Sequence, residues 1–178
     1  EFIASARGLL LYFAHRVPES VEWLQDVAKF NPDHSAVYWL RCMVLSAAGE
    51  HEAAVTSGEI ALMRMGRMDR VLAYQAVACA RAGRAEQARG LLAELQQAHA
   101  TRYVAAYFPA MVLLALGERE AALAQLERGL AERDSMLRDV RVDRVWDGLR
   151  DEPRFQAIVE ALRVPFRSAE TKVLDTGS

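Results

Sequence analysis

Three glycines in similar surroundings recur in this chain at a fixed interval of 34 residues. Gly49, Gly83 and Gly117 each follow an apolar helical pattern, and an alanine comes five residues after each of them. A fixed period of this length, with glycine between two helical patterns, predicts a helical hairpin that is repeated along the chain. Each repeat buries its apolar side against the next one, so the period constrains the fold more than any other feature.

The period divides the chain into four repeats, at about 1–34, 35–68, 69–102 and 103–136. Residues at the eighth and twentieth positions are small, which lets the two helices of a repeat approach closely. Residues at the eleventh position are apolar or cysteine and fill the space between the helices. The three columns are Gly8, Cys42, Ala76, Ala110; Ser20, Ala54, Ala88, Ala122; and Leu11, Leu45, Cys79, Leu113.

Local departures from the pattern lead to further expectations. His15 replaces the turn glycine of the first repeat, and Gly58 inside a helix indicates a close neighbouring backbone. Pro109 either begins or kinks the first helix of repeat four. Asp69 and Thr101 are suited to cap the first helices of repeats three and four.

The period fails after Arg133, and residues 137–163 are expected to form a capping element that covers the last repeat. A linker is followed by a short helix around Val145–Leu149 and by a helix from Glu152 to about Arg163. Asp143 and Asp151 are the expected caps of these helices. The folded domain is therefore expected at 1–163, with a flexible tail at 164–178.

Composition and charge exclude several classes of partner. The 22 basic and 24 acidic side chains are mixed along the chain, which argues against nucleic acid and against an anionic membrane surface. No apolar run is long enough to cross a membrane and no signal peptide is recognised, so we expect a cytoplasmic protein without membrane insertion. The start inside a helical pattern indicates a piece of a longer protein, with Glu1-Phe2 as a cloning remnant.

No group of residues predicts an enzyme, a metal site or a cofactor. Cys42 and Cys79 fall in core columns, and the four histidines fall at turns or helix ends without metal-binding spacing. The final Asp175-Thr176-Gly177-Ser178 spells an aspartic-protease phrase, but it has no second copy and no flanking strands. The arginines and acids between 133 and 154 are interpreted as ion pairs on a solvated cap.

Repeat four and its continuation carry a longer pattern. They read LGEREAALAQLERGLAERD and then VDRVWDGLRDEPRFQAIV. The period and these motifs resemble the tetratricopeptide (TPR) family, and within it the C-terminal segments of bacterial serine/threonine kinases, nucleotide cyclases and winged-helix transcription activators. The resemblance implies an all-α, right-handed solenoid of four repeats with a C-terminal capping helix, used as a regulatory, partner-binding appendage. The chain departs from the pattern at Arg144 and Glu152, where proline and aspartate are commoner.

The resemblance also implies a concave groove lined by the first helix of each repeat. An apolar groove of this kind suits an amphipathic helix or an extended apolar segment of a partner. The alternative is that the same side chains pack between helices, because core and groove columns differ by one residue. The expected groove residues are Trp39, Met43, Tyr107, Met111, Leu9, Tyr12, Val77, Arg70 and Arg81.

The sequence therefore favours a non-catalytic protein–protein interaction scaffold, the regulatory TPR portion of a bacterial signalling or transcription-regulating protein. The runner-up is a self-association module. A related possibility is that the open face of repeat one, with Phe2, Leu9, Leu10 and Phe13, docks a missing N-terminal domain or a second copy. An enzyme is a distant third.

Overall fold

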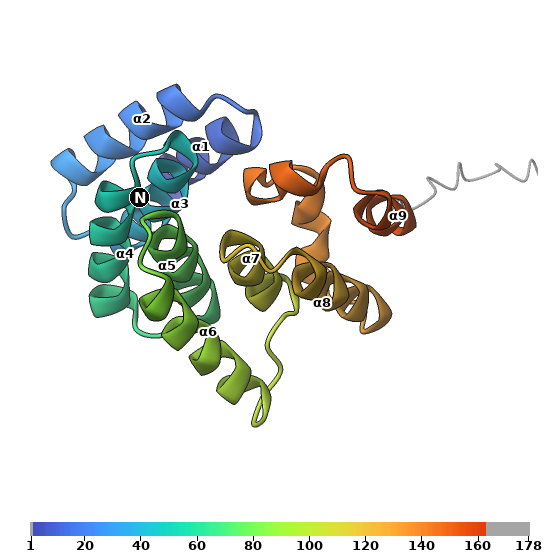
Figure 1. Ribbon diagram of the computed structural model, residues 1–178. Helices are drawn as coiled ribbons and strands as arrows, with labels where there is room; N and C mark the ends of the chain where they lie inside the picture. The colour runs from blue at the N-terminus through green and yellow to red at the C-terminus, as the bar shows by residue number, and fades with distance from the viewer. Residues whose placement is uncertain (1, 163–178) are drawn as a thin grey trace, which may run out of the picture.

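The computed structural model describes residues 2–162, and within that range helices are the only regular secondary structure (Figure 1). The all-α fold class is therefore confirmed for this part of the chain. The first eight helices are α1 (Phe2–Phe13), α2 (Val17–Phe30), α3 (Ser35–Ala48), α4 (His51–Met65), α5 (Asp69–Arg81), α6 (Ala85–His99), α7 (Tyr107–Ala115) and α8 (Arg119–Ala131). None of the described helices is both long and apolar enough to cross a membrane.

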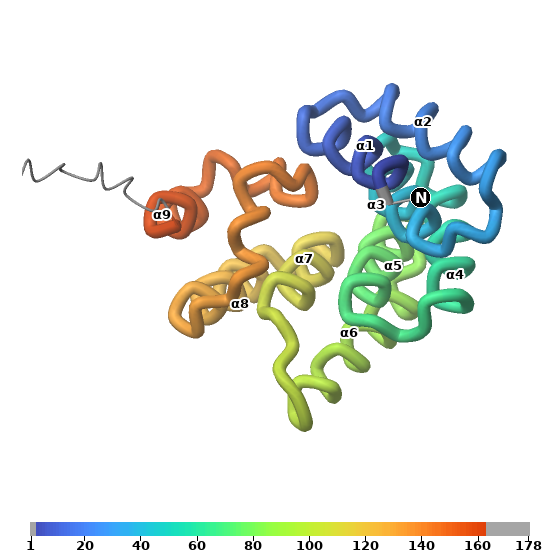
Figure 2. Tube along the Cα trace, turned by 180° about the vertical axis from the view of Figure 1, so that it is seen from behind, coloured from blue at the N-terminus to red at the C-terminus, as the bar shows by residue number. Residues whose placement is uncertain are grey.

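Consecutive helices pair into four hairpins, α1–α2, α3–α4, α5–α6 and α7–α8, and each hairpin packs on the next. The odd-numbered helices also pack on one another, α1 on α3, α3 on α5 and α5 on α7. The hairpins follow an arc, and the odd-numbered helices lie along its inner side (Figures 1 and 2). We call this side the inner face.

The turns between paired helices fall at the glycines that set the period. Gly49, Gly83 and Gly117 have φ values of 86°, 77° and 84°, in the left-handed region that glycine adopts without steric cost. His15 takes the same place in the first hairpin with φ 60°. The regular turn therefore extends to the repeat that lacks its glycine.

The two columns of small residues lie where the paired helices approach. All eight residues at the eighth and twentieth positions are buried. In the first hairpin the approach leaves no room for a side chain, since a Cβ on Gly8 would lie 2.4 Å from Cδ2 of Leu24. Ser20 is also held there, because its hydroxyl donates to the Gly8 carbonyl at 2.7 Å.

Several local expectations require correction. The residue at the N-cap of α5 is Met68, so Asp69 is the first helical residue and not the cap. Thr101 does not cap the next helix either, because α7 begins only at Tyr107. Pro109 consequently falls in the first turn of α7, where its missing N–H costs no intrahelical hydrogen bond. The close neighbour of Gly58 is the side chain of Gln75 and not a backbone.

Three short helices follow the last hairpin. They are the 3₁₀ helices η1 (Ser135–Arg141) and η2 (Arg144–Leu149) and the α-helix α9 (Pro153–Ala161). The expected linker is thus partly helical, and the N-cap of α9 is Glu152 and not Asp151. α9 packs on α8, and Arg154 pairs with Glu120 and Glu127 of that helix. The expected tail and its Asp-Thr-Gly-Ser phrase lie outside the described residues.

Candidate functional site

Asp143, in the connection between η1 and η2, is fully buried against the inner face. Its Oδ1 accepts hydrogen bonds from the hydroxyl of Tyr12 at 2.6 Å and from the backbone N–H of Val145 at 3.0 Å. Its Oδ2 accepts from the hydroxyls of Tyr74 at 2.8 Å and Tyr107 at 2.6 Å. A carboxylate has about four acceptor positions, and all of them are used here. The carboxylate therefore joins the C-terminal segment to α1, α5 and α7.

The electrostatics of this cluster keep the tyrosines protonated. Burial, and then the neighbouring charge of Asp143, raise the pKa of Tyr12, Tyr74 and Tyr107 well above the usual value for tyrosine. No described arginine, lysine or histidine forms an ion pair with the Asp143 carboxylate. Hydrogen bonds from neutral hydroxyls and one amide therefore hold this buried acid.

Trp146 packs η2 against α7 and α9 through aromatic contacts. Its ring is fully buried, with its centroid 5.3 Å from that of Tyr107 and 6.2 Å from that of Phe155. The ring of Tyr107 meets it edge-on at 73°, an arrangement that aromatic pairs favour. Leu137, Val140, Val145 and Leu149 of the same segment are also buried. Residues 134–149, which we call the inner segment, thus form part of the core.

The nine residues expected to line a groove divide into two groups. Five of them are buried and have no surface to offer a partner in this structure: Tyr12, Met43, Val77, Tyr107 and Met111. Leu9, Trp39 and Arg81 are partly buried, and Arg70 is exposed. Packing between helices, the alternative considered above, describes the first group. Partner binding by the second group stays a prediction.

The prediction for Asp143 is wrong in one respect. It does cap η2, through Val145, but its place is buried and not on a solvated ion-pairing surface. Tyr12 and Tyr107 were assigned to the inner face from their repeat positions. Nothing in the sequence pairs these tyrosines with an acid from a segment outside the period, so their shared partner could not be found.

One part of the inner face stays open beside the inner segment. Trp39 of α3 is partly buried, its ring centroid lies 5.8 Å from that of Tyr74, and the guanidinium carbon of Arg70 lies 5.1 Å from its ring centroid. This is a cation–π distance, and it leaves an apolar ring and a charged group at the surface together. We call Trp39 and Arg70 the Trp39 platform.

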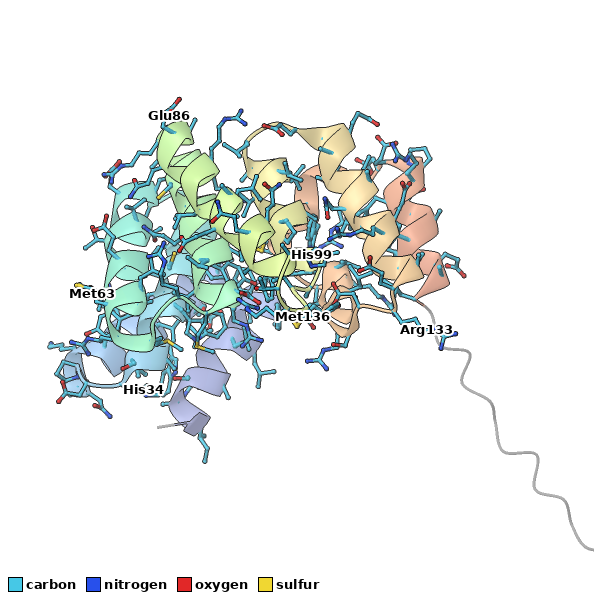
Figure 3. The ribbon with its side chains drawn as sticks, turned by 90° about the horizontal axis from the view of Figure 1, so that it is seen from below. His34, Met63, Glu86, His99, Arg133 and Met136 are labelled. Carbon is cyan, nitrogen blue, oxygen red and sulfur yellow. The ribbon has the colours of Figure 1, made fainter. Side chains whose placement is uncertain are left out.

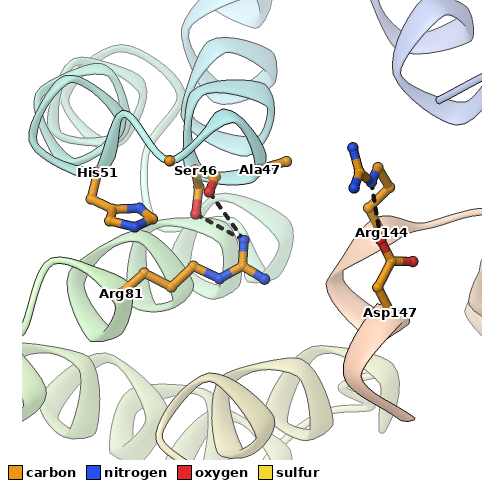
Figure 4. A pocket seen from close by; sticks show the side chains of 7 residues that line it. Ser46, Ala47, His51, Arg81, Arg144 and Asp147 are labelled. Carbon is orange, nitrogen blue, oxygen red and sulfur yellow. Dashed lines mark hydrogen bonds and ion pairs between the residues drawn. The ribbon is translucent and has the colours of Figure 1, made fainter. Parts of the chain in front are cut away.

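A pocket of about 400 Å³ lies between the C-terminal ends of α3 and α5 and the start of η2. Arg81 reaches back to α3, where its Nη1 donates to the Ser46 carbonyl at 3.3 Å and to the Ser46 hydroxyl at 3.2 Å. On the opposite wall Arg144 pairs with Asp147 at 3.0 Å (Figure 4). The full lining is Ser46, Ala47, Gly49, His51, Arg81, Arg144 and Asp147.

The cysteines are buried in the core, and the histidines form no cluster within residues 2–162. Cys42 and Cys79 are buried, and burial raises the pKa of both thiols, that of Cys79 to about 11. A thiol with a raised pKa is a poor nucleophile at neutral pH. His34 and His99 lie far apart (Figure 3), and the described residues contain no group of three or more potential metal ligands.

Comparison with known proteins adds no identification. No protein-family model matches the chain, and no curated protein matches its sequence significantly.

Proposed function

We propose that this chain is a non-catalytic protein–protein interaction module of TPR type, the regulatory portion of a bacterial signalling or transcription-regulating protein. The stacking of four helical hairpins supports the fold part of this proposal. The motifs within about residues 103–163 support the signalling context by resemblance. The inner segment occupies much of the expected groove, so the proposed partner site is smaller than the groove.

The observation that carries the proposal is the Trp39 platform. A tryptophan that lies partly exposed beside an exposed arginine offers an apolar surface and a cation together. Tryptophan and arginine are enriched among the residues that dominate binding energy at protein interfaces. We propose that a partner segment places an apolar side chain on Trp39 and an acidic side chain near Arg70.

A selection of random peptides displayed on phage tests this site. Peptides enriched on the wild-type chain should carry an acidic residue close to an apolar one. Their affinity should fall by about tenfold or more in Trp39→Ala. Trp23→Ala is a matched control, because Trp23 is also partly buried and lies under an arginine, Arg7, at 3.9 Å. A failure to enrich any peptide, or equal losses in both variants, would contradict the proposal.

Self-association is the second candidate, and one observation favours it. Ile3 and Leu10 are 83% and 66% exposed, and they lie two turns apart on one side of α1. A second copy could cover this apolar strip. Light scattering after size exclusion should then give a dimer for the wild type and a monomer for Leu10→Glu. A monomer at every wild-type concentration would exclude this candidate.

A further inference from the structure

The pocket between α5 and η2 carries more positive charge than its own acid can compensate. Arg81 has no carboxylate partner among the residues that the structure describes, and its two hydrogen bonds go to Ser46. Asp147 is the acid in the lining, and two arginines share it. Nε of Arg144 lies 3.0 Å from its Oδ2, and Nε and Nη2 of Arg150 each lie 3.3 Å from its Oδ1. One guanidinium group therefore faces the pocket without an anion.

His51 extends this polar lining. The ring of His51 lies on the same wall as Arg81 (Figure 4), and its Nδ1 is buried with no hydrogen-bond partner in the described part of the chain. Glu50 and Glu52 line an adjoining hollow, to which His51 and Arg81 also contribute. Glu52 is already paired with Arg84. None of the acids in the part of the chain that the structure describes forms an ion pair with Arg81.

The chemistry of the lining selects a class of ligand. A guanidinium group presents several N–H donors in one plane, and this geometry matches the two oxygens of a carboxylate or phosphate. Nη1 of Arg81 is used by Ser46, whereas its Nε and Nη2 make no hydrogen bond within residues 2–162. The pocket volume of about 400 Å³ is in the range of small-molecule sites and leaves room for an organic group beyond the oxyanion.

We propose that this pocket binds a small organic oxyanion, a carboxylate or a phosphate monoester, with Arg81 as its main contact and Arg144 on the opposite wall. The ligand would touch α3 and α5 on one side and η2 on the other. Its binding would therefore add a bridge between the hairpins and the inner segment. This inference is independent of the proposed partner site, because Trp39 and Arg70 are not in the pocket lining.

Isothermal titration with benzoate, phenyl phosphate and inorganic phosphate tests the proposal at low ionic strength. The wild type should show saturable binding of one of the two organic ions with a stoichiometry of one. Binding of benzoate alone assigns a carboxylate ligand, and binding of phenyl phosphate alone assigns a phosphate monoester. Binding of inorganic phosphate without either organic ion would overturn the proposal, because the organic group would then have no place in the pocket.

Substitutions locate the binding. Arg81→Gln should lower the affinity for the organic ion by about tenfold or more, and Arg144→Gln should lower it as well. Arg84→Gln is the matched control, because it removes an equal charge three residues away that is outside the lining and should change affinity less than about twofold. Equal weakening by Arg84→Gln and Arg81→Gln, or no saturable binding by the wild type, would overturn the proposal.

Hydrogen exchange supplies a second readout that does not depend on Arg81. Saturating ligand should slow exchange at amides of residues 144–149, because the bridged inner segment opens less often. Arg144→Gln should abolish this protection, since its guanidinium is the contact from η2. Binding without any change in exchange at 144–149 would overturn the bridging role.

Discussion

At the scale of single residues, Gly58 in α4 has the least room for a side chain among the described glycines. A Cβ at this position would lie 1.7 Å from Oε1 of Gln75 and 2.9 Å from Sγ of Cys42. Gln75 is itself buried, and its amide nitrogen lies 3.6 Å from Sγ of Cys79. The glycine therefore makes room for a buried polar side chain of the next hairpin.

Substitution of this glycine should destabilise the protein in spite of helix propensity. Alanine favours a helix by about 1 kcal/mol over glycine, but displacement of Gln75 should cost more, for a net loss of about 1–3 kcal/mol. Gly90→Ala in α6 is the control, because nothing lies within 4 Å of its would-be Cβ, and it should stabilise by about 0.5–1 kcal/mol. Urea unfolding measures the stability of both variants. A Gly58→Ala variant as stable as the wild type would contradict the close contact between Gly58 and Gln75.

The two cysteines should be unreactive in the folded protein. Both thiols are buried and burial raises the pKa of each, so the thiolate is scarce and inaccessible at neutral pH. Alkylation by iodoacetamide should be about a thousandfold slower than in denaturant, because it requires opening of the core. Mass spectrometry measures the two rates, and rapid alkylation of Cys42 under native conditions would contradict its placement.

At the scale of elements, the inner segment is held to the odd-numbered helices by the Asp143 hydrogen bonds. A hydrogen bond to a charged group contributes about 1.5–3 kcal/mol, so Tyr74→Phe should lower the free energy of unfolding by about that amount. Tyr38→Phe is the control, because the Tyr38 hydroxyl donates to the Pro32 carbonyl at the surface. This substitution should lower the free energy of unfolding by less than about 1 kcal/mol. Equal effects in urea unfolding would argue against the cluster.

The same cluster predicts a loss of stability at alkaline pH. The tyrosines of the unfolded chain ionise near pH 10, whereas the pKa values of Tyr12, Tyr74 and Tyr107 are raised in the folded state. The unfolded state therefore releases protons first, so this contribution is complete below about pH 10 and declines as pH rises further. Urea midpoints from pH 8 to 11 should fall less steeply in Tyr74→Phe, and an unchanged slope would contradict the assignment.

The elements also show how far the sequence could be interpreted. Turns and small-residue columns were predictable, because they repeat every 34 residues and depend on neighbours in sequence. The start of α7 was not predictable from the sequence. The Tyr107 N–H donates to the Asp134 carboxylate at 3.2 Å, and this contact joins residues 27 positions apart. The site was predictable only in part. The positions of Tyr12 and Tyr107 on the inner face could be predicted from the 34-residue period. Asp143 could not be paired with them, because it lies in the segment where the period has failed.

At the scale of the whole molecule, one carboxylate connects the two ends of the hairpin stack. Hairpins in such a stack contact mainly their neighbours, so the first one could open independently of the last. The bond between Tyr12 and Asp143 joins residues 131 positions apart and closes the arc. The hairpins and the inner segment are therefore expected to open as a single unit.

Native-state hydrogen exchange on the wild type and on Asp143→Ala tests this closure most directly. Removal of the carboxylate should lower protection in η2 and also in α1, which is far from position 143 in sequence and depends on it through Tyr12. A decrease confined to residues 134–149, with α1 unchanged, would show that the inner segment does not tie the stack together.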